Sequence, residues 1–144
     1  MAQLAHYSLF PRKGWPWPNF PPDEPYLACP CCGELWLHKE SMHRLQRARD
    51  LLGRPMRLNS GHRCAIHNAR VGGAPLSQHK LIAFDVSLHG HDRQAVLAAL
   101  LQAGFGSFGF YATFIHADVR PGRRWFGPIS AREKERWNSV ISSM

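Results

Sequence analysis

Two stretches of the chain each place a histidine and an aspartate close together. The first stretch contains His79 and Asp85, six residues apart. The second, further along the chain, is apolar and contains His116 and Asp118. Two imidazoles and a carboxylate on adjacent strands form a three-ligand zinc site with an open fourth position, which is the arrangement of catalytic zinc. A closed structural site is more often rich in cysteine. The sequence therefore predicts a zinc hydrolase built around these two stretches.

The size and charge of the chain limit the classes of protein that it can be. Its 144 residues, 44% of them apolar, suffice for one domain with a buried core. The formal net charge of +8 favours an anionic partner, such as nucleic acid, a phosphate-rich surface or an anionic cell-wall polymer. Because the basic residues are scattered rather than gathered in a block, we expect no nucleic-acid partner.

The chain carries no targeting or membrane signal that we recognise. No apolar run approaches the roughly 18 residues of a membrane span. The first residues also lack the basic start and the long apolar region of a signal peptide. We therefore expect a protein without a membrane span that is synthesised in the cytoplasm.

The sequence has four cysteines: Cys29, Cys31, Cys32 and Cys64. From their spacing we favour a disulfide from Cys29 or Cys32 to Cys64, which would tie the N-terminal arm to the body of the domain. A structural metal is an alternative that needs Cys64 and a neighbouring histidine as further ligands. Free thiols are a third possibility for these cysteines. A disulfide would imply an oxidising environment.

The pattern of apolar residues and of helix-ending residues predicts a single α+β domain over residues 1–144. Residues 1–28 are rich in proline and aromatic residues, which predicts an extended arm laid over the body. Helical spacing and capping residues predict helices over 38–52, 64–71, 91–103 and 130–142. Short apolar runs between turns predict strands over 55–58, 82–88, 107–111 and 113–119.

A series of short motifs runs along the chain from Tyr26 to Trp125. Among them are Asn-Ser-Gly-His-Arg-Cys at 59–64, Ser-Gln-His at 77–79, Ala-Phe-Asp-Val at 83–86 and Phe-Ile-His-Ala-Asp at 114–118. In this order they resemble the LAS-type zinc peptidases, which unite the D-Ala-D-Ala carboxypeptidases, the L-Ala-D-Glu endolysins and the hedgehog signalling domain. The similarity is greatest to the small bacterial and phage branch of the family.

The resemblance implies a fold and a set of site residues. The fold is a small antiparallel sheet with helices packed on one face and a zinc cleft on the other. His79, Asp85 and His116 are the zinc ligands. Arg63 matches the arginine that faces the substrate and the developing oxyanion, which is how a fixed guanidinium stabilises transition-state charge. Ser77 lies beside a ligand histidine and binds substrate.

Two features depart from the family pattern. The segment between His79 and Asp85 is one residue shorter and has no glycine, and a one-residue slip turns strand side chains to the opposite face. We expect residues 80–82 to absorb the difference. Relatives also place a carboxylate or histidine shortly before the last ligand, which this chain lacks. Asp118 is the nearest acid and our candidate general acid and base, unless it only hydrogen-bonds the imidazole of His116.

The resemblance also implies a function. We expect a zinc metallopeptidase that hydrolyses a stem-peptide amide bond in peptidoglycan, of the D-Ala-D-Ala carboxypeptidase or the L-Ala-D-Glu endopeptidase type. It would act in the periplasm or cell wall, after release as a phage-like endolysin or as a component of a phage or phage-like particle. The alternative is a non-catalytic module that binds cell wall or protein and keeps only a degenerate zinc site.

Overall fold

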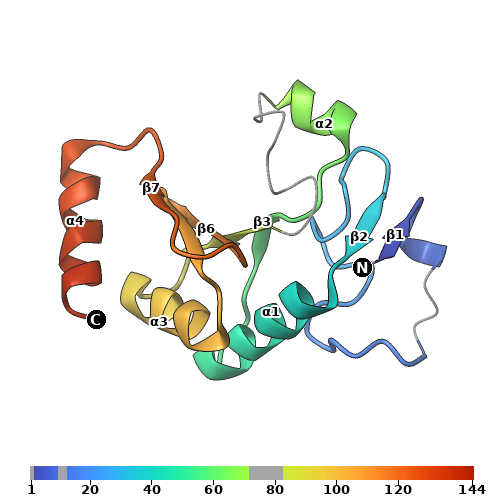
Figure 1. Cartoon of the computed structure of the whole chain (residues 1–144), viewed down its shortest axis with the longest axis horizontal. Coiled ribbons are helices and arrows are strands. Elements are labelled where there is room, and N and C mark those ends of the chain that lie inside the picture. Colours follow the sequence, from blue (N-terminus) through green and yellow to red (C-terminus); the bar gives the residue numbers. More distant parts are fainter. Residues whose placement is uncertain (1, 10–12, 72–82) are drawn as a thin grey trace.

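A five-stranded sheet forms the centre of the molecule (Figure 1). The computed structural model describes residues 2–9, 13–71 and 83–144. The strands of this sheet are β3 (Leu58–Ser60), β4 (Phe84–Ser87), β5 (Ser107–Phe110), β6 (Phe114–Asp118) and β7 (Arg124–Phe126). Their order is β3-β4-β6-β5-β7, and all neighbours are antiparallel except β5 and β7, which are parallel. The structure therefore confirms the predicted α+β class, and β7 is a strand that the sequence pattern did not reveal.

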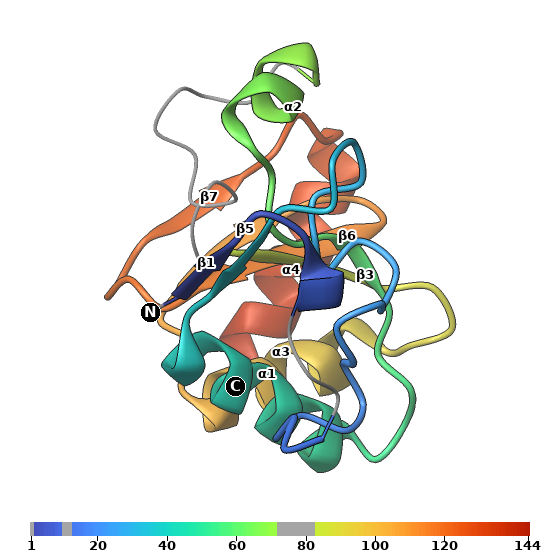
Figure 2. The ribbon, with the colours of Figure 1, turned by 90° about the vertical axis from the view of Figure 1, so that its right-hand side faces the viewer.

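Helices lie on both sides of this sheet. Helices α1 (Lys39–Leu52) and α3 (Arg93–Ala103) lie together below it, and the short helix α2 (Ala65–Arg70) lies above it (Figures 1 and 2). Helix α4 (Ala131–Ser142) lies at the end of the molecule next to β7 (Figure 1). Helices α1 and α3 thus cover one face, as predicted, whereas α2 occupies the side that the resemblance assigns to the cleft.

Local capping explains where the long helices begin and end. The side chain of Asp92 accepts a hydrogen bond from the amide of Ala95 at the start of α3, and Gly104 ends that helix with a φ of 103°. Ser130 caps α4 in the same way by accepting from the amide of Glu133. Because these signals are readable in sequence, the predicted helices agree with the structure to within about two residues.

The alternation of side chains along the strands separates the core from the opposite face. Phe84 and Val86 of β4 and Ile115 and Ala117 of β6 are buried in the hydrophobic core. Phe108, on β5, completes this buried layer. The residues between them, including the polar ones of β4 and β6, therefore point to the other face of the sheet.

The proline-rich N-terminal segment packs on α1 and adds a small second sheet. Trp17 is buried and its indole Nε1 donates to Nδ1 of His43 at 3.0 Å. The backbone amide of Asn19 donates to the side chain of Gln46 at 3.1 Å. A one-turn 3-10 helix, η1 (Tyr7–Leu9), follows strand β1 (Ala2–Leu4), which pairs with β2 (Leu35–Leu37). Neither of these short strands was predicted.

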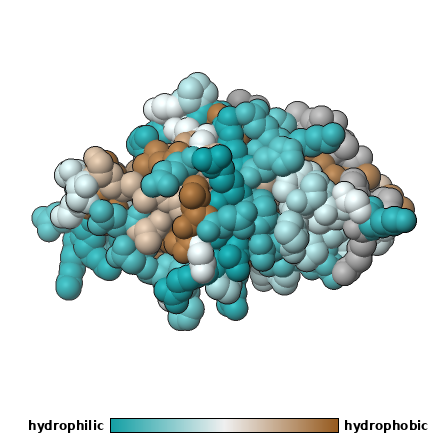
Figure 3. Space-filling view, turned by 90° about the horizontal axis from the view of Figure 1, so that it is seen from below, coloured by the Kyte–Doolittle hydropathy of each residue, from teal (hydrophilic) through white to brown (hydrophobic). Residues whose placement is uncertain are grey.

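The face of the molecule seen from below is largely hydrophilic, with an apolar area to the left of centre (Figure 3). Within the described residues, no helix has the length and apolar character needed to cross a membrane.

Trp137 is the buried residue of α4 that anchors this helix to the core. Its side chain is fully buried, its Nε1 donates to the carbonyl oxygen of Tyr111 at 2.9 Å, and its ring packs against Phe110. Replacing Trp137 by alanine removes this packing and should lower the free energy of unfolding by about 3–5 kcal/mol. Chemical denaturation would measure this, with the exposed Lys134→Ala in the same helix as control. Equal stabilities of the two variants would contradict the anchoring role.

Candidate functional site

Asp85 and His116 face each other across the centre of the sheet. The register of β4 against β6 makes them direct partners in the antiparallel pair. Both point to the face opposite the core, because Phe84, Val86 and Ile115 point into it. The distance between Oδ1 of Asp85 and Nδ1 of His116 is 3.3 Å. Both side chains are largely buried, so the pair is a fixed feature of the sheet.

Asp118 holds the other side of the His116 ring. Its Oδ2 lies 2.7 Å from Nε2 of His116 and accepts from Nη2 of Arg120 at 2.8 Å. Its Oδ1 accepts from the backbone amide and the Nε of Arg120, both at 3.0 Å. The Asp118 side chain is fully buried, and each of its oxygens already accepts two hydrogen bonds.

These contacts shift the ionisation of both groups. Burial raises the pKa of Asp118, but the hydrogen bonds from His116 and Arg120 outweigh it and keep the pKa well below its ordinary value. Burial lowers the pKa of His116, and the hydrogen bonds with Asp118 and Asp85 overcome this and raise it. Asp118 is therefore held as a carboxylate that accepts a hydrogen bond from the imidazole.

The atoms that face each other between Asp85 and His116 suit a metal ion. Without a metal ion, a proton on Nδ1 of His116 lies between the ring and Asp85, since the hydrogen bond with Asp85 raises the pKa of the imidazole. Once this proton is lost, with Nε2–H still directed at Asp118, Nδ1 and the carboxylate of Asp85 would offer two ligand atoms to one cation. Ligand atoms at about 2.0–2.1 Å from a tetrahedral zinc ion lie about 3.3 Å apart, which agrees with the observed 3.3 Å. A carboxylate behind the ligand imidazole is the usual support of such a site.

Two of the three predicted ligands are thus brought together. His79, the third, and Ser77, the predicted substrate-binding residue, lie outside the described residues, as do residues 80–82.

Arg63 lies between β3 and α2, close enough to the pair to be influenced by it. Burial lowers the pKa of its guanidinium, and the charges of Asp85 and Tyr111 oppose this shift. Arginine remains charged under such a shift. The structure therefore brings the predicted oxyanion-binding residue into the electrostatic range of Asp85.

Trp125 and Tyr111 belong to the same region, and sequence reasoning assigned neither of them a role. The rings of His116 and Trp125 are 4.9 Å apart, and Nε1 of Trp125 donates to the hydroxyl of Tyr111 at 3.4 Å. Gly109 is the register partner of both His116 and Trp125. A Cβ at Gly109 would lie 2.6 Å from the indole, so glycine is required for the tryptophan to lie there. A glycine inside an apolar strand was the available signal.

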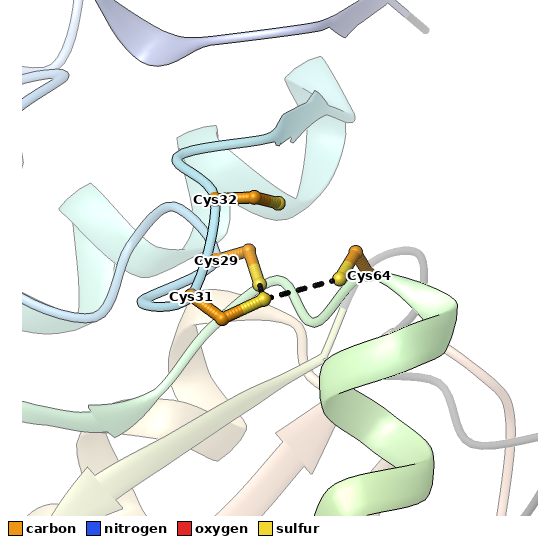
Figure 4. A group of neighbouring side chains, drawn as sticks. All are labelled: Cys29, Cys31, Cys32 and Cys64. Atoms are coloured by element: carbon orange, nitrogen blue, oxygen red, sulfur yellow. Dashed lines mark hydrogen bonds between the residues drawn. The ribbon is translucent and has the colours of Figure 1, made fainter.

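The cysteines form a second cluster of potential metal ligands. Cys29, Cys31, Cys32 and Cys64 are all free thiols, so the predicted disulfide from Cys29 or Cys32 to Cys64 is absent from the structure. Their sulfur atoms nevertheless meet, and all lie within 4.8 Å of one another (Figure 4). The nearest sulfur pairs, at 3.4 and 3.5 Å, are well beyond the disulfide bond length of about 2.05 Å.

The chain matches the model of a known protein family. A family model described as Peptidase M15 matches residues 23–118, which is well over half of the chain and includes Arg63, Asp85, His116 and Asp118. No curated protein matches the chain.

The contacts of Asp118 favour the positioning role over proton transfer. Replacing Asp118 by asparagine removes the carboxylate behind His116 and should weaken zinc binding about 10–100-fold. Titration of the metal-free protein with zinc against a competing chelator measures this, with the exposed Glu135→Gln as control. A proton carrier would behave differently, because the variant would then lose turnover while its zinc affinity stayed unchanged.

Proposed function

The chain belongs to the peptidase M15 family, and from this premise we propose that it hydrolyses an amide bond in the stem peptide of peptidoglycan. Members of the family are zinc-dependent metallopeptidases, so the general activity follows from membership. The substrate is either a D-Ala-D-Ala terminus or an L-Ala-D-Glu bond. The observation that carries the proposal is the direct cross-strand pairing of Asp85 with His116.

Asp85 and His116 would hold the zinc ion, with His79 as the third ligand. When bound, zinc lowers the pKa of its water ligand and polarises a carbonyl group. Asp118 would fix the ring of His116 in the tautomer that presents Nδ1 to the metal, and Arg120 in turn holds Asp118 in place. The role of the chain at this centre is therefore to keep the ligand atoms preorganised.

Arg63 would bind the oxygen of the scissile carbonyl. Its guanidinium is half-buried, and Asp85 influences it electrostatically. A fixed cation stabilises the negative charge that develops on this oxygen, and partial burial strengthens the interaction because less water screens it. Tyr111 and Trp125 border the same region and would exclude water from one side of the reacting bond.

The positive charge of the protein fits the proposed substrate. A net charge of +8 attracts an anionic cell wall, and this attraction weakens as salt is added. We place its action in the periplasm or cell wall, as a released endolysin or as a component of a phage-like particle, with peptidoglycan and particle proteins as partners. The scattered basic residues favour such a surface over nucleic acid.

One observation favours a second candidate function, a module that binds cell wall or protein without cleaving it. Asp118 was the predicted proton carrier, and its two oxygens are already engaged by His116 and Arg120. An acid in this position is poorly placed to exchange a proton with water. Hydrolysis then needs another group as the general base, and without one the site would only bind.

The Arg63→Ala variant separates catalysis from binding. It should keep the fold and the zinc content and lose about 100-fold in turnover, because it removes a contact that strengthens in the transition state. The matched control is Arg70→Ala, an exposed arginine at the end of α2. Mass spectrometry of digested peptidoglycan would follow the release of new amino or carboxyl termini.

The same assay decides between the two functions. An unmutated, zinc-loaded protein that binds peptidoglycan of every type and releases no new termini would be a binding module. Equal turnover of Arg63→Ala and Arg70→Ala would instead remove Arg63 from the catalytic machinery.

A further inference from the structure

The four cysteines come from two segments that are distant in sequence. Cys29, Cys31 and Cys32 lie on the loop before β2, and Cys64 lies immediately before α2 (Figure 4). The Sγ atom of Cys31 is 3.5 Å from that of Cys29 and 3.4 Å from that of Cys64. All four sulfur atoms lie within 4.8 Å of one another.

These distances match a tetrahedral site. Sulfur atoms at about 2.3 Å from one zinc ion lie about 3.8 Å apart, which falls inside the range of distances observed here. A disulfide would join only two of the four sulfurs and gives no reason for the other two to gather at the same point.

The loop that carries three of the cysteines has the backbone of a metal-binding turn. Cys29 and Cys32 have the Cys-x2-Cys spacing typical of structural zinc. The amide of Cys29 donates to the carbonyl of Glu34, and the amide of Gly33 donates back to the carbonyl of Cys29, both at 2.8 Å. Gly33 has a φ of 76°, a conformation that glycine adopts without strain. The tight turn directs the thiols of this loop toward Cys64.

We propose that Cys29, Cys31, Cys32 and Cys64 bind a zinc ion in a tetrathiolate structural site. This site is separate from the Asp85–His116 centre and shares no residue with it. Thiolate ligands select zinc among the common divalent ions, and four protein ligands leave no open position for substrate. The chain therefore binds two zinc ions of different kinds.

The proposed ion would join two segments that already contact each other closely. The amide of His62 donates to the carbonyl of Leu27 at 3.1 Å, and Nε2 of His62 donates to Glu34 at 2.8 Å. A Cβ at Gly61 would lie only 2.5 Å from the carbonyl oxygen of Tyr26, so the two backbones touch. Zinc bound to Cys64 would stabilise this contact between the two segments.

The proposed tetrathiolate site would also affect the catalytic site. This part of the inference rests on the proposed function. Arg63 lies directly between His62, which the loop holds by hydrogen bonds, and Cys64, which the zinc would hold. The structural zinc would thus act as a positioning device for the arginine that faces the substrate. Loss of the zinc should loosen Arg63 without touching Asp85 or His116.

Metal analysis of the full-length chain tests the proposal directly. The unmutated protein should carry about two zinc ions per chain, and Cys64→Ser and His116→Ala about one each. Replacement of zinc by Co²⁺ then tells the two sites apart, because thiolate ligands give Co²⁺ an intense near-ultraviolet charge-transfer absorption. His116→Ala should keep this absorption and Cys64→Ser should lose it.

A second measurement on the unmutated protein covers the case in which Cys64→Ser does not fold. Titration with an organomercurial reagent blocks thiolates, and a chromogenic chelator reports the zinc that they release. We expect about one zinc ion to be released as the four thiols react. Release of no zinc, or a mass of the unreduced protein that reveals a disulfide, would overturn the proposal.

These outcomes are independent of the proposed function. A protein with the thiolate-bound zinc and no peptidase activity would keep the structural site and lose the catalytic assignment. A protein that cleaves peptidoglycan with a single zinc, lost in His116→Ala, would keep the activity and remove the tetrathiolate site.

Discussion

The pairing of Asp85 with His116 across β4 and β6 is the interaction on which the rest of the site depends. Antiparallel register places the carboxylate and the imidazole on the same face, and a shift of one residue in either strand would turn one of them into the core. Their 3.3 Å separation lets Oδ1 of Asp85 and Nδ1 of His116 share a proton or hold a metal ion in its place. Asp118 and Arg120 complete it by holding the imidazole from behind.

The segment between β3 and α2 connects the two clusters of potential metal ligands. On one side Arg63 reaches the electrostatic field of Asp85, and on the other Cys64 meets the three cysteines of the preceding loop. In the proposed site, the cysteine cluster would set the position of Arg63, the residue assigned to the substrate. Such support is what a small domain needs, because a guanidinium stabilises a transition state only if it is held in place.

The sequence predicted the features that depend on local patterns. The two His/Asp pairs and the family resemblance predicted that Asp85 and His116 belong to one site on adjacent strands. Capping residues such as Asp92 and Ser130 predicted where the helices begin. The features it missed depend on tertiary contacts. Strand β7 is three residues long and lies beside β5 because Gly109 leaves room for Trp125. Likewise, spacing alone cannot tell a disulfide from a group of four thiols that meet in space.

The most direct test of the central claim is anomalous diffraction at the zinc edge from crystals of the full chain grown with zinc. The expected result is an anomalous peak at about 2.0–2.2 Å from a carboxylate oxygen of Asp85 and from Nδ1 of His116, with His79 as the third ligand. Zinc-saturated crystals in which Asp85 and His116 share a direct hydrogen bond, with no peak beside them, would contradict it.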